Sequence, residues 1–300
     1  MFGDYLYVAL EEEEIRILVG KRKGRTLRVR GCGHIPVERE VWGQEWPQEG
    51  ARRLKMLVQK QKWRGHKCFV LLDREGIVVR QARLPYLKPK ELDKFLRSEM
   101  QEFLPVDVED YVCDYAVVGN QTAEDGTKRQ EILLAAVPRT VMNQLALFLE
   151  ELGFPVEAVD IAPRCFLRLF EPNEGCMILN LKKKGGTVTL LDEAGLLLHA
   201  DLPSYLGWEE DPEQLVAEAR GYAEFFASRH QGLPVGEVWV CGGLVQEKPK
   251  VVENLQDVLP TSVRLAKAGD VGFTIREKRD TRFAEQSPAY APLLGLALRR

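Results

Sequence analysis

The sequence predicts a mixed α/β protein that consists of two similar lobes. Segments 6–37 and 176–204 share one plan: an apolar strand, a charged turn, a second strand, another turn, and a third strand that closes at a proline. Repetition of a three-strand meander within one chain is typical of a duplicated fold. The 300 residues, 45% of them hydrophobic, are also enough for about two domains with a large core.

The first meander has strands at 6–10 and 15–19, separated by the acidic turn 11–14. Apolar residues then alternate with charges at helical spacing, so we interpret the basic stretch 55–67 as the solvated face of a helix. Segments 67–72 and 76–84 read as paired strands with a turn at 73–76.

An amphipathic helix is expected next, beginning at Pro89 and stopped by Pro105. Strands 111–118 and 131–137 flank a polar segment and predict a long hairpin. A further helix over 141–152 ends at Gly153, a residue typical of helix C-termini.

Segment 171–175 is the best linker candidate, and the second meander follows it. We then expect a long helix from Asp211 to about His230 and an apolar strand over 237–241 that runs into Gly242 and Gly243. A last helix begins at Ser287, which is followed by proline.

Composition excludes several classes of function. A net charge of −3 gives no global attraction to nucleic acid. No run approaches 18 apolar residues and no signal peptide is evident, so we expect a soluble, intracellular protein without direct membrane insertion. The six cysteines lack metal-ligand spacing and the four histidines are scattered, which favours reduced, largely structural thiols and no metal or catalytic motif.

The order of these elements resembles the actin-like ATPase superfamily, whose fold is a duplicated ribonuclease H-type unit in two lobes. Within it, segments 99–106, 114–115, 133–139, 156–160 and 288–298 resemble the PilM family of type IV pilus assembly proteins. The resemblance covers nearly the whole chain and rests on the order and spacing of the motifs.

The resemblance implies a domain plan. Residues 1–80 form the core of the first lobe, completed by 156–172 and by a C-terminal helix over 287–300. Residues 81–155 form an inserted small subdomain of the kind shared with the cell-division protein FtsA. Residues 173–286 form the second lobe, and a nucleotide cleft lies between the lobes.

The family's two phosphate loops fall on segments 11–14 and 180–182 of this chain. The implied nucleotide positions are Glu11, Glu13, Asn180, Lys182, Gly185, Gly186, Gly242 and Gly243. An anion-binding loop needs glycine for close backbone approach, and Glu13 stands there instead. At about 5 Å and an effective dielectric near 20, each glutamate–phosphate pair costs roughly 3 kcal/mol.

Asn180 replaces the carboxylate expected to hold a metal-bound water. Two readings stay open for the neighbouring residues. Segment 182–184 beside its two glycines either grips phosphate or is a solvated hairpin tip. The Gly242–Gly243 pair either admits a nucleotide or simply makes a turn.

We therefore expect an actin-fold scaffold that has lost nucleotide turnover and carries no cofactor, with ATP and magnesium disfavoured. The resemblance implies binding of the N-terminal cytoplasmic peptide of a PilN-like bitopic membrane protein, and contact with a pilus motor ATPase as a further candidate partner. The chain is then cytoplasmic and peripheral to the inner membrane. The expected groove lies between the first-lobe core and the subdomain and is lined by Val78, Leu84, Leu92, Phe95, Leu96 and Phe103.

Three alternatives stay open at this point. One is the cytoplasmic component GspL of type II secretion, another is a functional ATPase of the FtsA or sugar-kinase kind, and the third is a regulatory pseudokinase. We also expect the acidic turn 11–14 and the basic turn 182–186 to face one another and close the cleft by their opposite charges.

Overall fold

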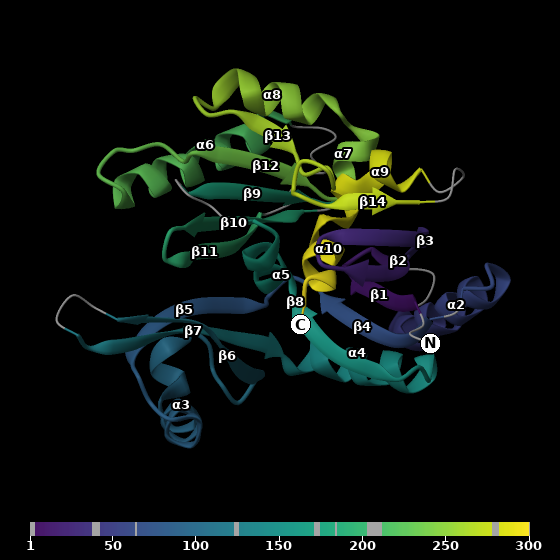
Figure 1. Ribbon diagram of the computed structural model, residues 1–300, viewed down its shortest axis with the longest axis horizontal. Helices are drawn as coiled ribbons and strands as arrows, with labels where there is room; N and C mark the ends of the chain where they lie inside the picture. The colour runs from purple at the N-terminus through teal and green to yellow at the C-terminus, as the bar shows by residue number, and fades with distance from the viewer. Residues whose placement is uncertain are drawn as a thin grey trace.

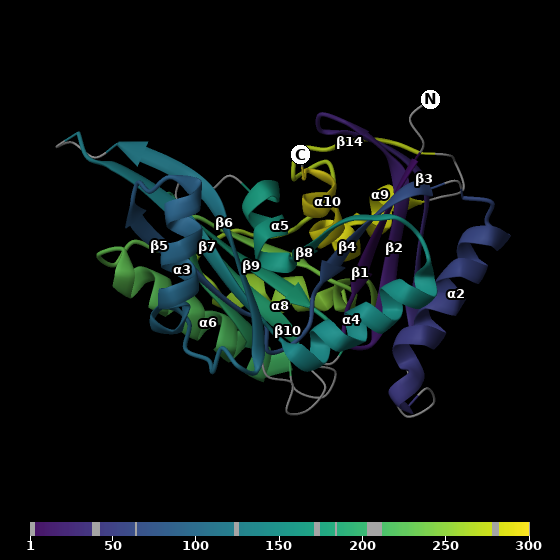
Figure 2. The same ribbon diagram turned by 90° about the horizontal axis from the view of Figure 1, so that it is seen from below.

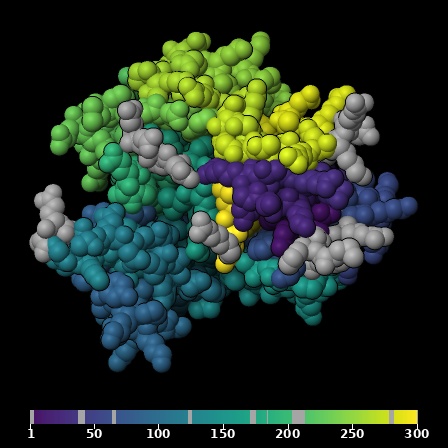
Figure 3. Space-filling view, viewed as in Figure 1, coloured from purple at the N-terminus to yellow at the C-terminus, as the bar shows by residue number. Residues whose placement is uncertain are grey.

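The computed structural model of the chain describes residues 4–37, 43–63, 65–122, 126–170, 175–183, 185–202, 212–277 and 282–299. Figure 1 shows two lobes, one above the other, and an inserted subdomain beside the lower one. In the space-filling view this subdomain protrudes from the body at the lower left (Figure 3). Among the described residues, no helix has the length and apolar character needed to cross a membrane.

The first lobe is a six-stranded sheet in the order β14-β3-β2-β1-β4-β8. Antiparallel β1, β2 and β3 form the predicted meander, while β4 and β8 continue the sheet in parallel. Helices α2 and α4 cover one side and helices α5 and α10 the other (Figures 1 and 2). The strands are β1 (Asp4–Leu10), β2 (Glu14–Lys23), β3 (Thr26–Pro36), β4 (Gly65–Leu72), β8 (Val156–Ile161) and β14 (Thr274–Arg276).

The helical segments of this lobe come from three separate parts of the chain. They are η1 (Gly43–Glu45), α2 (Trp46–Lys60), α4 (Arg139–Leu152), α5 (Ala162–Leu169), α9 (Phe283–Gln286), η2 (Ser287–Tyr290) and α10 (Ala291–Ala297). The C-terminal helix α10 packs on α5, β1 and β4, so the end of the chain returns to the first lobe. At Gly295 a side chain would meet the Cys165 backbone, which explains how closely α10 and α5 approach.

The second lobe repeats the plan of the first. Its sheet has the order β11-β10-β9-β12-β13, in which a three-strand antiparallel meander is extended by two parallel strands. Apart from β14 at the edge of the first sheet, both sheets thus read third, second, first, fourth, fifth strand, which is the arrangement expected of a duplicated ribonuclease H-type fold. The elements are β9 (Cys176–Leu181), β10 (Gly186–Asp192), β11 (Gly195–Leu202), α6 (Pro212–Arg229), β12 (Glu237–Cys241), α7 (Leu244–Glu247), α8 (Lys250–Val258) and β13 (Val263–Leu265).

The inserted subdomain is a three-stranded sheet, β5-β7-β6, with helix α3 on its outer face. Leu92 and Leu96 of α3 are buried against this face, as the amphipathic pattern predicted. The opposite face presents Leu133 and Val137 to the core of the first lobe. The elements are β5 (Val78–Pro85), α3 (Pro89–Phe103), β6 (Tyr111–Thr122) and β7 (Lys128–Pro138).

Several sequence expectations need correction. Strands β4 and β5 are not paired: β4 runs beside β1 and β8, whereas β5 pairs with β7. Helix α2 ends at Lys60, so the basic stretch 55–67 is only partly helical. Strand β14 lies within the range 173–286 expected for the second lobe, yet it pairs with β3 of the first.

Other expectations concern parts of the chain that the structure does not describe. Linker residues 171–174, Lys184 of the basic turn, and residues 203–204 at the end of the second meander lie outside the described residues. None of the six cysteines, all of which lie within the described residues, forms a disulfide; four are buried, and Cys32 and Cys113 are half-buried. No metal-binding group of histidine, cysteine and carboxylate side chains occurs in the described part of the chain.

Candidate functional site

A buried ion pair joins the two lobes at the place where the family resemblance implies the interlobe cleft. Lys182, just after β9, donates from Nζ to Asp73 Oδ1 at 2.7 Å and to the Asp73 carbonyl at 2.8 Å. Asn180 donates from Nδ2 to the other Asp73 oxygen at 2.9 Å. Asp73 follows β4, so the contact joins the first lobe to the second. All three side chains are buried, which places this pair in a low-dielectric environment.

A second ion-pair cluster fills the first-lobe side of the same cleft. Arg16 of β2 contacts Glu11 Oε1 through Nε at 3.0 Å and also pairs with Glu14. The guanidinium lies 5.7 Å from the centre of the Tyr290 ring. It also occupies the space in which a side chain at position 243 would lie, so Gly243 contacts a protein cation there.

The pKa values in the cleft follow from burial and from these partners. Burial raises the pKa of Glu11 to about 8, although Arg16 opposes this shift. Burial lowers the pKa of Lys182, but the attraction of Asp73 outweighs it and raises the pKa overall. Burial also lowers the pKa of His199 to about 4; its Nδ1 lies 2.9 Å from Thr189 Oγ1. The arrangement keeps Lys182 charged and His199 neutral at pH 7.

Most positions that the family resemblance assigned to nucleotide meet in this cleft. Glu11, Asn180, Lys182 and Gly243 belong to the two clusters described above. Gly242 has φ +97°, and a side chain there would meet the Leu181 backbone. The strand end therefore requires a glycine for close packing, whatever it binds.

The remaining positions belong to the two hairpin turns. The Glu13 carbonyl accepts a hydrogen bond from Val37 N at 2.5 Å. Gly185 has φ +84°, and its carbonyl accepts from Lys182 N at 3.0 Å. Gly186 begins β10, and Lys183 at this turn pairs with Glu247 at 2.8 Å. The carboxylate in direct contact with Lys182 is Asp73, and the glutamates of turn 11–14 add their attraction: Glu11 and Glu12 raise the pKa of Lys182, and Glu13 and Glu14 raise that of Lys183.

Sequence reasoning missed the residues that organise the cleft. The sequence placed Asp73 and Arg74 in the turn 73–76 and Arg16 in the strand 15–19, without a functional role for any of them. Arg74 is buried: its Nη1 donates to the Glu11 carbonyl at 3.1 Å, and its Nε pairs with Glu12 at 2.8 Å. The only local signal for Arg16 was a charge inside the apolar strand 15–19.

A groove separates the inserted subdomain from the first lobe. One pocket, of about 200 Å³, lies between the inner face of the β5-β7-β6 sheet and β8 with α5. Apolar residues make up most of its lining, including Val112, Ala116, Leu133, Met142 and Val159. A second pocket, of about 530 Å³, continues past Val117 and Val118 toward the turn between β10 and β11. Arg164 of α5 lines both pockets, so they are neighbours along β6, and we refer to the two together as the groove.

The groove lining differs from the one expected. Leu84, Leu92 and Leu96 are buried inside the subdomain, and Val78 is half-buried beside them. Phe95 and Phe103 pack edge to face, with ring centres 6.2 Å apart, on α3. Because α3 covers the outer face of the sheet, these six residues lie on the side away from the groove. The pocket found here is lined by β6, β7, β8 and α5, and the six residues remain an untested prediction for partner binding.

Comparisons with known proteins identify the fold. No protein-family model matches the sequence, and no curated protein does. A chain from a PilM-PilN type IV pilus biogenesis complex superposes with a TM-score of 0.76 over 98% of both chains, at 18% sequence identity. The cytoplasmic domain of EpsL, an inner-membrane component of the type II secretion system of Vibrio cholerae, superposes with a TM-score of 0.52 over 97% of this chain and 94% of that one, at 15% identity. At such identities the likeness establishes the actin-like fold.

Proposed function

We propose that this actin-like protein is an adaptor of type IV pilus assembly. In this role it binds the N-terminal cytoplasmic peptide of a PilN-like bitopic membrane protein and is held at the inner membrane through that partner. The proposal is supported by the near-complete overlap with a chain of the PilM-PilN complex. A pilus motor ATPase is a further candidate partner.

The observation that carries the proposal is the groove between the subdomain and the first lobe. Its first pocket is mainly apolar, and Val112 at its rim is 37% exposed. Two strands flank it, β6 and β8, and each is the last strand of its sheet in the described residues. An extended peptide can place apolar side chains in such a pocket and pair its backbone with an open strand edge.

The cleft between the lobes supports a role without nucleotide turnover. Its two buried cations, Arg16 and Lys182, already pair with carboxylates of the chain. A triphosphate would have to displace these partners and approach the Glu14 carboxylate, which carries its own sign of charge. We therefore infer that ATP with magnesium does not saturate the protein at cellular concentrations and is not hydrolysed.

The test is calorimetric titration with the synthetic N-terminal peptide of the bitopic membrane protein encoded beside this chain. We expect micromolar affinity, and a loss of about tenfold or more when Val112→Lys places a charge in the apolar pocket. Val258→Lys is the matched control, because Val258 is a similarly exposed valine on α8 of the second lobe. Phe95→Lys, on the outer face of the subdomain, should also keep full affinity.

Two results would contradict the proposal. One is a peptide that binds Val112→Lys as well as it binds the unaltered protein while both remain folded. The other is micromolar binding of ATP with magnesium, or turnover that Asn180→Ala abolishes. The first result would place the peptide site outside the apolar pocket, and the second would make the interlobe cleft a nucleotide site.

A second candidate function is a component of type II secretion. The overlap with the EpsL cytoplasmic domain favours it, although the TM-score is lower than for the pilus complex. Both candidates use the same fold as an adaptor, so the neighbouring genes distinguish them. Pilus assembly genes support the first candidate, and type II secretion genes support the second.

A further inference from the structure

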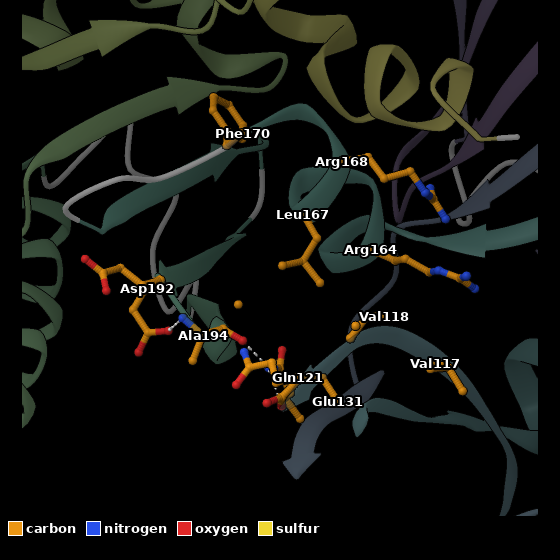
Figure 4. A pocket seen from close by; sticks show the side chains of 14 residues that line it. Val117, Val118, Gln121, Glu131, Arg164, Leu167, Arg168, Phe170, Asp192 and Ala194 are labelled. Atoms are coloured by element: carbon orange, nitrogen blue, oxygen red, sulfur yellow. Dashed lines mark hydrogen bonds between the residues drawn. The ribbon is translucent and has the colours of Figure 1, made fainter. Parts of the chain in front are cut away.

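Arg164 stands where the two pockets of the groove meet. It projects from α5, the helix that forms one wall, and it lines both the apolar pocket and the larger one. In Figure 4, Arg164 and Leu167 lie on the side of α5 that faces the strand bearing Val117 and Val118. A peptide that follows the groove from one pocket to the other must pass this guanidinium.

The nearby carboxylate of Asp160 forms ion pairs with two other arginines. Arg168 Nη2 and Arg299 Nη1 each contact Asp160 Oδ2 at 2.7 Å, and Ile161 N donates to Asp160 Oδ1 at 3.0 Å. Three guanidinium groups therefore surround one buried carboxylate. Arg164 makes no hydrogen bond or ion pair with any described residue.

The surroundings of Arg164 disfavour its positive charge. Burial lowers its pKa; Asp160 opposes this shift, while the positive charges of Arg168 and Arg299 add to it. The side chain is half-buried and remains charged at neutral pH. Arg164 shares the charge of Asp160 with two other arginines that contact it directly, so its guanidinium at the wall of the groove can still pair with a carboxylate supplied from outside.

We propose that Arg164 recognises an acidic side chain of the bound peptide, at the junction between the two pockets. This inference rests on the proposed peptide-binding function and specifies its sequence requirement. Apolar residues of the peptide occupy the first pocket, and an aspartate or glutamate next to them forms a two-pronged contact with the guanidinium. The rest of the peptide continues into the larger pocket.

The larger pocket connects this contact to the second lobe. Its far wall is the turn between β10 and β11, which includes Asp192 and Ala194. Gln81 of β5 holds this turn: its Nε2 donates to the Ala194 carbonyl, and Leu196 N donates to its Oε1 at 2.7 Å. The subdomain, α5 and the second lobe thus all contribute to the part of the groove beyond Arg164.

The experiment compares the neighbour-encoded N-terminal peptide with versions in which each acidic residue in turn becomes its amide. For the unaltered protein we expect one such change to weaken binding about tenfold or more. Arg164→Gln should bind the native peptide more weakly by a similar factor. This variant should bind the native peptide and the critical amide peptide with equal affinity. Arg164→Lys should recover part of the affinity, and increasing salt should weaken binding less for Arg164→Gln than for the unaltered protein.

The control is Arg97→Gln on the exposed face of α3, which should leave every affinity unchanged. Arg164→Gln is expected to keep its melting temperature, because Asp160 retains Arg168 and Arg299. The inference is overturned if the acidic and amide peptides bind equally well, or if Arg164→Gln weakens both by the same factor. If either result is found while Val112→Lys still weakens peptide binding, the proposed peptide-binding function is supported and only the role of Arg164 is contradicted.

Discussion

Single residues decide what the interlobe cleft can do. Lys182 Nζ contacts Asp73. The Arg16 guanidinium contacts Glu11 and lies close to Gly243. The chain therefore supplies both the cations and their counter-charges at the place where the family's phosphate loops fall. Glutamates at this turn are tolerated because Arg16 and Arg74 bind them.

The Lys182–Asp73 pair makes a testable contribution to stability. Lys182→Met leaves Asp73 as a buried carboxylate without its cation, and such a loss typically costs about 3–5 kcal/mol. Lys183→Met is the matched control, because Lys183 forms an exposed pair with Glu247 and should change stability by less than about 1 kcal/mol. Urea denaturation measures both changes, and equal effects for the two variants would show that the buried pair does not hold the lobes together.

Glu11 predicts a specific pH dependence of stability. Its folded pKa is raised by burial to about 8 from 4.5, so the folded protein holds a proton that the unfolded chain releases between these values. The associated stability is fully present below about pH 4.5 and is lost as pH rises through 8.

The measurement is the free energy of unfolding between pH 7.5 and 8.5, above the range in which His199 of the unfolded chain, with an ordinary pKa of 6.5, releases its proton. Stability of the unaltered protein should decline over this window, and Glu11→Gln should flatten the decline. An unchanged slope in the variant would show that Glu11 stays ionised in its pair with Arg16.

At the scale of elements, local patterns predicted local structure well. The meander β1-β2-β3, its counterpart β9-β10-β11, the β6–β7 hairpin and helix α3 all follow from apolar periodicity and turn residues close in sequence. Pairing between distant segments was not predictable in the same way. Strand β5 pairs with β7, some fifty residues away, while the sequence suggested its immediate neighbour β4.

The same limit applies to the candidate sites. The family resemblance led to Glu11, Asn180, Lys182 and Gly243, which do lie together. It did not reveal Asp73, because a Lys182–Asp73 contact joins residues 109 positions apart. Helix α3 shows an apolar stripe in the sequence, but the stripe is used by its own sheet, and the open groove is on the other face. Amphipathicity indicates that a face is buried, not which partner buries it.

At the scale of the whole molecule, the two lobes are joined by polar contacts that need no ligand. Besides the Lys182–Asp73 pair, Gly76 N donates to Asp201 of β11 at 3.1 Å, and Gln81 holds the turn between β10 and β11. The cleft is thus closed by the chain itself, while the groove beside the subdomain stays open (Figure 4).

Hydrogen–deuterium exchange, measured for the protein alone, with millimolar ATP and magnesium, and with the neighbour-encoded peptide, tests this central claim most directly. We expect the peptide to slow exchange over β6, β8 and α5, and ATP with magnesium to leave exchange unchanged around turns 11–14 and 182–186. Slower exchange at those two turns with ATP, together with no protection of β6, β8 and α5 by the peptide, would contradict the account.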